Sequence, residues 1–203
     1  MRILLLHDPY LPITAGAVGG EDNLANLEFE VLSDRGHEVI DGRAIDTGLE
    51  RKFNQIRAQT IGSSPEVIEL IKFTNPDVIH THNLNQRSGY SWMNQTITPI
   101  VSSIHNYRLF CPSSIAYREA NNCVECRDHG TIRAIRNGCD GIRGALNASR
   151  PLLFQRTEPQ IKIPKIFLIA SNLMQSQLQP KIPLNKFRLL RNPGHLTAPD
   201  GRK

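Results

Sequence analysis

The chain has 203 residues, a hydrophobic content of 39% and a formal net charge of +5. This composition supports one α/β domain with a buried core and is too small for two. Lys and Arg are scattered, so the basic face that nucleic-acid binding needs is missing. No stretch reaches the roughly 18 apolar residues of a spanning helix, and the opening apolar run ends at Asp8, too early for a signal peptide. We therefore expect a cytoplasmic protein with no nucleic-acid partner.

The first half of the chain alternates between strand and helix patterns. Residues 2–7 form an apolar run typical of a buried parallel strand, and the long glycine- and proline-containing loop 8–20 follows it. In the predicted helix 21–35, Leu24, Leu27, Val31 and Leu32 recur at helical spacing, and Gly36 supplies a left-handed stop. Strand 38–40, a helix from Pro65 to about 73, strand 77–80, helix 86–98 and strand 99–104 come next.

The second half starts with a cysteine-rich stretch, which we interpret as an insertion at about 109–140 after the fourth strand. A helix within 142–157, strand 166–170, a helix capped by Ser171 and reaching about 179, and strand 187–190 complete the pattern. Alternation of this kind predicts a Rossmann-like, doubly wound and mainly parallel sheet. Residues 46–59 fit no pattern.

Ligands of such a sheet bind beyond the carboxyl ends of its strands, where helix N-termini also converge. After the first strand, Gly19, Gly20 and Glu21 lie where a loop becomes a helix, and glycines there let the backbone approach a phosphate. The pattern is neither of the standard nucleotide motifs, so a flexible loop with a helix start is the alternative.

His80 and His82 alternate along the third strand, so their imidazoles project from one face. Two histidines can hold a metal, but no third ligand is close in sequence, which favours a polar role facing the substrate. A histidine that is simply hydrogen-bonded remains the alternative.

His105, Asn106, Tyr107 and Arg108 follow the fourth strand directly. An imidazole, an amide, a phenol and a guanidinium together suit a ligand rich in hydroxyls or phosphates. The alternative is a loop in which the tyrosine packs and the arginine is solvated.

Cys111, Cys123, Cys126 and Cys139 all lie in the cysteine-rich stretch. Four thiolates suffice for a tetrahedral structural zinc site, in which His129 could replace one cysteine. Only one pair has the close CxxC spacing, so reduced free thiols are an equal alternative, and a cytoplasmic location disfavours disulfides.

Taken in order, these motifs resemble the N-terminal domain of family 4 glycosyltransferases of the GT-B fold, from Met1 to about Gly194. The likeness is carried by five short runs: Met1-Arg2-Ile3-Leu4, Gly19-Gly20-Glu21, Arg35-Gly36-His37-Glu38-Val39, Pro76-Asp77-Val78-Ile79-His80-Thr81-His82-Asn83 and His105-Asn106-Tyr107-Arg108. The cysteine-rich stretch resembles an insertion found in a subset of these enzymes.

The resemblance implies a retaining hexosyltransferase-like enzyme that needs no metal for catalysis and uses a nucleotide sugar as donor substrate. It places Gly19, Gly20 and Glu21 near the donor phosphates and His105 near the transferred sugar as the catalytic residue. His82 and Asn83 would border the acceptor pocket, together with Asn106, Tyr107 and Arg108. A glycan or lipid-linked acceptor is implied, and with a lipid-linked one, peripheral membrane contact.

The sequence departs from the family because the donor-binding C-terminal domain is missing. We expect residues 1–191 to form the glycosyltransferase N-terminal domain and 192–203 to begin an interdomain linker or tail. The chain would then be a fragment, a truncated reading frame or one subunit of a split enzyme, with the donor domain in cis or in trans. The alternative functions are a noncatalytic carbohydrate- or acceptor-binding or regulatory module, and a metal-stabilised docking surface on the cysteine-rich stretch.

Overall fold

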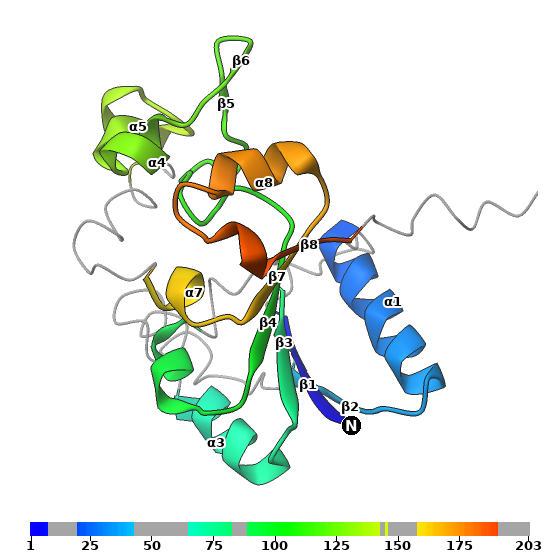
Figure 1. Cartoon of the computed structure of the whole chain (residues 1–203). Helices are drawn as coiled ribbons and strands as arrows, with labels where there is room; N and C mark the ends of the chain where they lie inside the picture. Colours follow the sequence, from blue (N-terminus) through cyan, green and yellow to red (C-terminus); the bar gives the residue numbers. More distant parts are fainter. Residues whose placement is uncertain (8–19, 43–64, 83–88, 143–144, 146–157, 191–203) are drawn as a thin grey trace, which may run out of the picture.

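The computed structural model describes residues 1–7, 20–42, 65–82, 89–142, 145 and 158–190. Its centre is a six-stranded, all-parallel sheet with the strand order β2-β1-β3-β4-β7-β8 (Figure 1). The strands are β1 (Arg2–Leu6), β2 (Glu38–Asp41), β3 (Val78–Thr81), β4 (Ile100–Ile104), β7 (Ile166–Ile169) and β8 (Phe187–Leu189). The predicted α/β class, the parallel sheet and all six strand positions are confirmed.

The order of the strands reverses at β1. The chain passes from β1 to β2 on one side, and then to β3 on the other side of β1, where Leu6 of β1 pairs with Thr81 of β3. In open parallel sheets, ligands usually bind beyond the carboxyl ends of the strands at such a reversal.

Helix α1 (Gly20–Asp34) lies on one side of the sheet, away from the other helices (Figure 1). Glu21 and Asp22 in its first turn complement the helix dipole. Gly36, at a φ of 80°, ends it, with its N–H donating to the carbonyl of Ser33. The predicted helix start and stop are confirmed, but Val31, expected on the apolar stripe, is 43% exposed.

The opposite face carries the apolar core. Leu4 and Leu6 of β1 pack with Trp92 and other residues of α3 (Pro65–Thr74) and the 3-10 helix η2 (Ser91–Gln95). Further along the sheet, Phe167 packs with Met174 of α8 (Asn172–Leu178), while α7 (Glu158–Lys162) and the 3-10 helix η3 (Leu184–Lys186) complete this side. Since strand side chains alternate, the intervening residues of β1 and β3 point toward α1 instead.

The prediction of a helix over residues 86–98 is wrong for the part that the structure describes. Only η2 is helical there, because Gly89 has a φ of 54° and Thr96 returns to extended backbone. Trp92 and Met93 are both buried by this single short turn, whereas Ile97 is fully exposed, so a longer amphipathic helix has no apolar face to bury.

Between β4 and β7 lies the cysteine segment, which we define as residues 109–142. It contains a small antiparallel hairpin, β5 (Tyr117–Arg118) with β6 (Asn121–Asn122), and two short helices, α4 (Glu125–His129) and α5 (Ile132–Arg136). In Figure 1 these elements extend away from the central sheet.

Several predictions fall outside the described residues, namely most of the helix within 142–157, the Ser64 cap and the tail 192–203. Among the helices that are described, none has the length and apolar character needed to cross a membrane.

Candidate functional site

Four histidines and two carboxylates gather at the carboxyl edge of the sheet, on the side covered by α1. We call this group the histidine cluster. It brings together the ends of β1, β3 and β4, which are far apart in the sequence but adjacent in the sheet. Its members are His7, Asp22, Glu28, His80, His82 and His105.

The centre of the cluster is a chain of three groups. His82 Nε2 lies 3.0 Å from Oε2 of Glu28, and His82 Nδ1 lies 2.8 Å from Nε2 of His105. The rings of His82 and His105 are stacked, with centroids 5.0 Å apart. His82 is 1% exposed and both of its nitrogens contact protein groups, so it positions His105 and offers no free nitrogen to a ligand.

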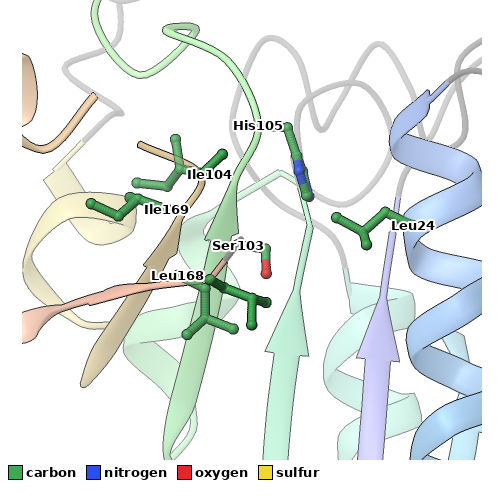
Figure 2. A pocket seen from close by; sticks show the side chains of 8 residues that line it. Leu24, Ser103, Ile104, His105, Leu168 and Ile169 are labelled. Carbon is green, nitrogen blue, oxygen red and sulfur yellow. The ribbon is translucent and has the colours of Figure 1, made fainter. Parts of the chain in front are cut away.

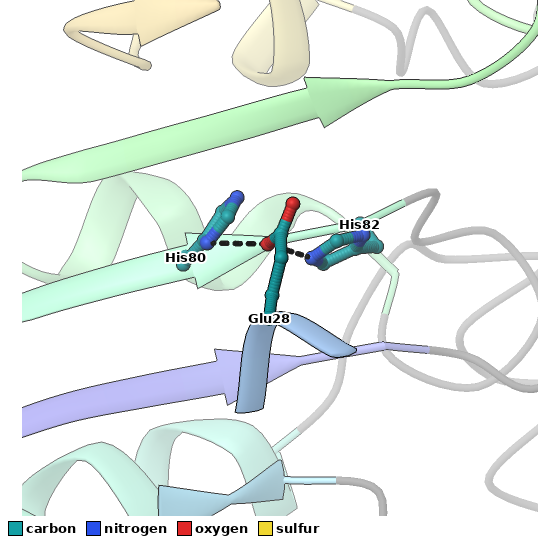
Figure 3. Close-up of side chains that lie close together, drawn as sticks. All are labelled: Glu28, His80 and His82. Carbon is teal, nitrogen blue, oxygen red and sulfur yellow. Dashed lines mark hydrogen bonds and ion pairs between the residues drawn. The ribbon is translucent and has the colours of Figure 1, made fainter. Parts of the chain in front are cut away.

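His80, two residues before His82, also contacts the Glu28 carboxylate. Its Nδ1 lies 3.2 Å from Oε2 of Glu28, and its Nε2 lies 2.8 Å from the hydroxyl of Ser103 on β4. Figure 3 shows the Glu28 side chain extending from α1 to lie between the imidazoles of His80 and His82. His80 and His82 therefore face the same side of the strand, as their spacing predicted.

The first strand contributes a second pair. His7, just after β1, lies with its Nε2 2.5 Å from Oδ1 of Asp22 in the first turn of α1. The His7 ring also meets His82 edge to face, with centroids 5.8 Å apart. This pair fixes the start of α1, and with it Gly20, at the same edge as His82 and His105.

Burial sets the protonation of the cluster. Desolvation, together with the neighbouring His82, lowers the pKa of both His80 and His105 to about 4. Desolvation also raises the pKa of Glu28, against the opposing effect of His80 and His105. His80 and His105 are consequently neutral at physiological pH.

The hydrogen bonds then assign the tautomers. An ionised Glu28 can only accept hydrogen bonds, so His82 donates from Nε2 and must accept at Nδ1 from the Nε2–H of His105. In this arrangement Nδ1 of His105 keeps its lone pair. The site thus presents one neutral imidazole as an oriented hydrogen-bond acceptor.

Two buried atoms of the cluster lack a hydrogen-bond partner among the described residues, His7 Nδ1 and Glu28 Oε1. Such groups call for ordered water or a ligand group. The ligand atoms of Glu28, His80 and His82 also lie within 4.8 Å of one another, and a cation could bridge them only in place of the hydrogen bond between His82 and Glu28. The third ligand that the sequence lacked near His80 is thus supplied by Glu28 of α1.

A small pocket opens beside His105 between α1 and the ends of β4 and β7 (Figure 2). Leu24 of α1 forms one wall, and Ile169 lines the side of β7. His105 and Ser103 are its polar lining groups. A ligand entering here would meet an apolar surface with the half-buried His105 imidazole beside it.

The glycine loop is only partly described. Gly20 is the exposed first residue of α1, and among the described residues no atom outside its own helix lies within 4 Å of where a Cβ would be. Glu21 follows it in the first turn. Gly19 and Asn83 lie outside the described residues.

The three residues after His105 interact mainly with neighbouring parts of the chain. The Asn106 side chain accepts a hydrogen bond from the Arg108 N–H at 2.9 Å. The Tyr107 ring packs beside Phe110 and against the apolar core, and burial raises the pKa of its phenol. This packed tyrosine matches the alternative given for this motif, and Arg108 is half-buried.

Sequence reasoning missed Glu28, Asp22 and Ser103. A signal for Glu28 exists, because it lies four residues after Leu24 and so shares the helix face that Leu24 buries. A carboxylate on a buried face requires polar partners, which the histidines provide.

All four cysteines lie in the described part of the chain, and none is in a disulfide. Cys111, Cys123, Cys126 and Cys139 line one pocket in the cysteine segment, whereas His129 lies exposed outside its lining. Burial, with a smaller effect of Cys111, raises the pKa of Cys126 to about 11.

Comparison of the chain with models of protein families, with curated proteins and with solved structures gave no match.

Proposed function

We propose that this chain is the acceptor-side domain of a retaining glycosyltransferase, which transfers a sugar from a nucleotide sugar to a glycan or lipid-linked acceptor. A donor-binding domain, in cis or in trans, completes the enzyme. The observation that carries the proposal is the placement of His105, a neutral imidazole held by His82 and Glu28 beside a pocket at the carboxyl ends of β4 and β7.

Two further features support this function. The order of the motifs resembles family 4 glycosyltransferases, and Gly20 begins a 15-residue helix whose dipole suits a donor phosphate. The parallel sheet with helices on both sides agrees with the Rossmann-like half of a GT-B enzyme, although many other functions use such sheets.

The proposed role of His105 is to position the sugar and stabilise the transition state. Because its pKa is lowered to about 4, it is a weak base at neutral pH and carries no charge. Its Nδ1 would accept a hydrogen bond from a hydroxyl of the transferred sugar. Such a bond contributes to rate only as far as it strengthens in the transition state.

Exchange of single residues tests this role in the chain itself. Imidazole chemical shifts would be followed by NMR while soluble oligosaccharides and short-chain polyprenyl-linked sugars are added. We expect an acceptor to shift the His105 signals, and we expect His105→Ala to weaken its binding by about tenfold, the value of one hydrogen bond. His129→Ala, an exposed histidine of the cysteine segment, is the matched control and should bind normally.

Two results would contradict the proposal. One is that no saccharide acceptor perturbs His105. The other is submicromolar binding of a nucleotide sugar to this chain alone in calorimetry, because the donor domain is proposed to supply most of that affinity.

A noncatalytic acceptor-binding module is the second candidate. It is favoured by the closed character of the cluster, in which His7, His80 and His82 are each less than 10% exposed. Addition of a donor domain to the chain distinguishes the two candidates. Transfer of labelled sugar by the mixture supports the enzyme, whereas acceptor binding without transfer supports the module.

A further inference from the structure

We propose that the four cysteines bind one structural zinc ion that holds the cysteine segment in its fold. The observation is their convergence. Cys111 follows the turn after β4, Cys123 follows β6, Cys126 lies in α4 and Cys139 follows α5, yet all four line the same pocket. The site is independent of the function proposed for the histidine cluster.

The cysteine segment has little apolar core of its own to hold these elements together. Large apolar side chains of the segment face solvent, while α4 and α5 have five residues each, too short to be stable alone. Ala134 is the one buried residue of these two helices. The exposed apolar residues are Ile115, Tyr117, Ile132, Ile135 and Ile142.

The backbone of the segment also requires support. Among the described non-glycine residues, six have a positive φ, and all but Asn75 lie between residues 114 and 140. L-residues rarely adopt this conformation, which persists where the surrounding structure enforces it. The hairpin of two-residue strands and the short helices supply few contacts for that purpose, whereas a metal bound at four points would supply them.

The donor set indicates which metal. Four cysteine thiolates in a tetrahedral arrangement are the preferred environment of structural zinc, which has no redox chemistry. Zinc displaces the thiol protons into solvent and leaves a site of net negative charge. Arg118 also lines the pocket and provides a compensating positive charge.

Binding would also brace the loop that follows His105. The Cys111 N–H donates to the carbonyl of Tyr107, and the Tyr107 N–H donates to the carbonyl of Ser114. Arg127 of α4 donates to the carbonyl of Gln177 in α8 at 2.7 Å. A metal joining Cys111 to Cys126 therefore links the end of β4 to the helix that covers β7.

Metal content and cobalt spectroscopy test the proposal on the whole chain. After expression in zinc-supplemented medium and gel filtration, we expect about one equivalent of zinc by elemental analysis. Replacement by Co²⁺ should give the intense visible bands of a tetrahedral site and the thiolate-to-metal charge-transfer band in the near ultraviolet. The spectrum needs no variant and so does not depend on a variant folding.

Variants locate the ligands. Cys123→Ser and Cys139→Ser should each lose the charge-transfer intensity of one thiolate and bind zinc at least tenfold more weakly. His129→Ala should keep full zinc content and an unchanged cobalt spectrum, since His129 lies outside the pocket lining. Less than about a tenth of an equivalent of zinc, or a cobalt spectrum unchanged by both cysteine variants, would overturn the proposal.

Discussion

At the scale of single residues, the unusual feature of this protein is a polar interior on one side of the sheet. His80 and Ser103 occupy strand positions that commonly hold aliphatic side chains in a parallel sheet. Their burial is tolerated because each polar group finds a partner, and Glu28 serves two imidazoles at once. Such networks are expensive to build and are typical of functional sites.

This network predicts how stability depends on pH. The pKa of His80 and His105 is about 4 in the folded chain, against 6.5 for an ordinary histidine. The unfolded chain thus binds more protons between these values, so stability is full above pH 6.5 and falls as the pH decreases toward 4. Glu28, whose pKa is raised, offsets part of the loss. We expect the free energy of unfolding to decrease by a net amount on the order of 3 kcal/mol between about pH 6.5 and pH 4.

Urea unfolding at several pH values between about pH 7 and pH 4.5 measures this decrease. The variant His105→Asn lacks one of the two titrating rings and should show a smaller slope over the same window. A slope identical to that of the unaltered chain would show that His105 keeps its ordinary pKa.

At the scale of elements, the site is positioned by the helix caps and by the side of each helix that packs on the sheet. Helix α1 is held by polar contacts as much as by apolar ones, since Asp22 and Glu28 both contact histidines while Leu24 and Ala25 are buried. Helix α8 illustrates the simpler case. Ser171 caps it by accepting a hydrogen bond from the Met174 N–H at 3.1 Å.

Removal of this cap gives a prediction for α8. Ser171→Ala should lower the free energy of unfolding by about 1 kcal/mol, because the Met174 N–H loses its acceptor. Ser176→Ala in the same helix is the control. Its hydroxyl donates to the Leu173 carbonyl at the exposed surface, so its loss should change stability by less than about 0.5 kcal/mol. Equal effects in chemical denaturation would refute the capping role.

At the scale of the whole molecule, two apolar clusters share one face of the sheet. One contains Trp92 with β1 and β3, and the other contains Phe167 with β7, β8 and α8. Ile100 of β4 belongs to the Trp92 cluster and Ile104 to the Phe167 cluster, so strand β4 connects the two clusters. A continuous core of this kind is expected to unfold as one unit.

The sole tryptophan provides a direct test of this cooperativity. Phe167→Ala removes a fully buried ring and should cost about 3–5 kcal/mol. We expect the loss to shift the unfolding transition reported by Trp92 fluorescence, although Trp92 lies in the other cluster. The circular dichroism transition should coincide with it.

Phe73→Ala is the control for this experiment, because Phe73 is 89% exposed and its removal should leave both transitions in place. A Trp92 transition that is unmoved by Phe167→Ala, or separate from the circular dichroism transition, would mean that the two clusters unfold independently.

The sequence by itself determined the sheet. Apolar runs, Gly36 and Pro65 mark strands and helix ends through local physical effects, so the six strands and three helix positions could be predicted. The sequence also predicted that His82 and His105 lie close together, because parallel strands bring their carboxyl ends to one edge of the sheet. Only the tertiary structure decided that Glu28 joins them, since a helix pattern does not specify which strand its polar side chain will meet. It also decided that His82 is closed to ligands, that Tyr107 packs inward and that four cysteines share one pocket, because each depends on contacts between segments distant in the sequence.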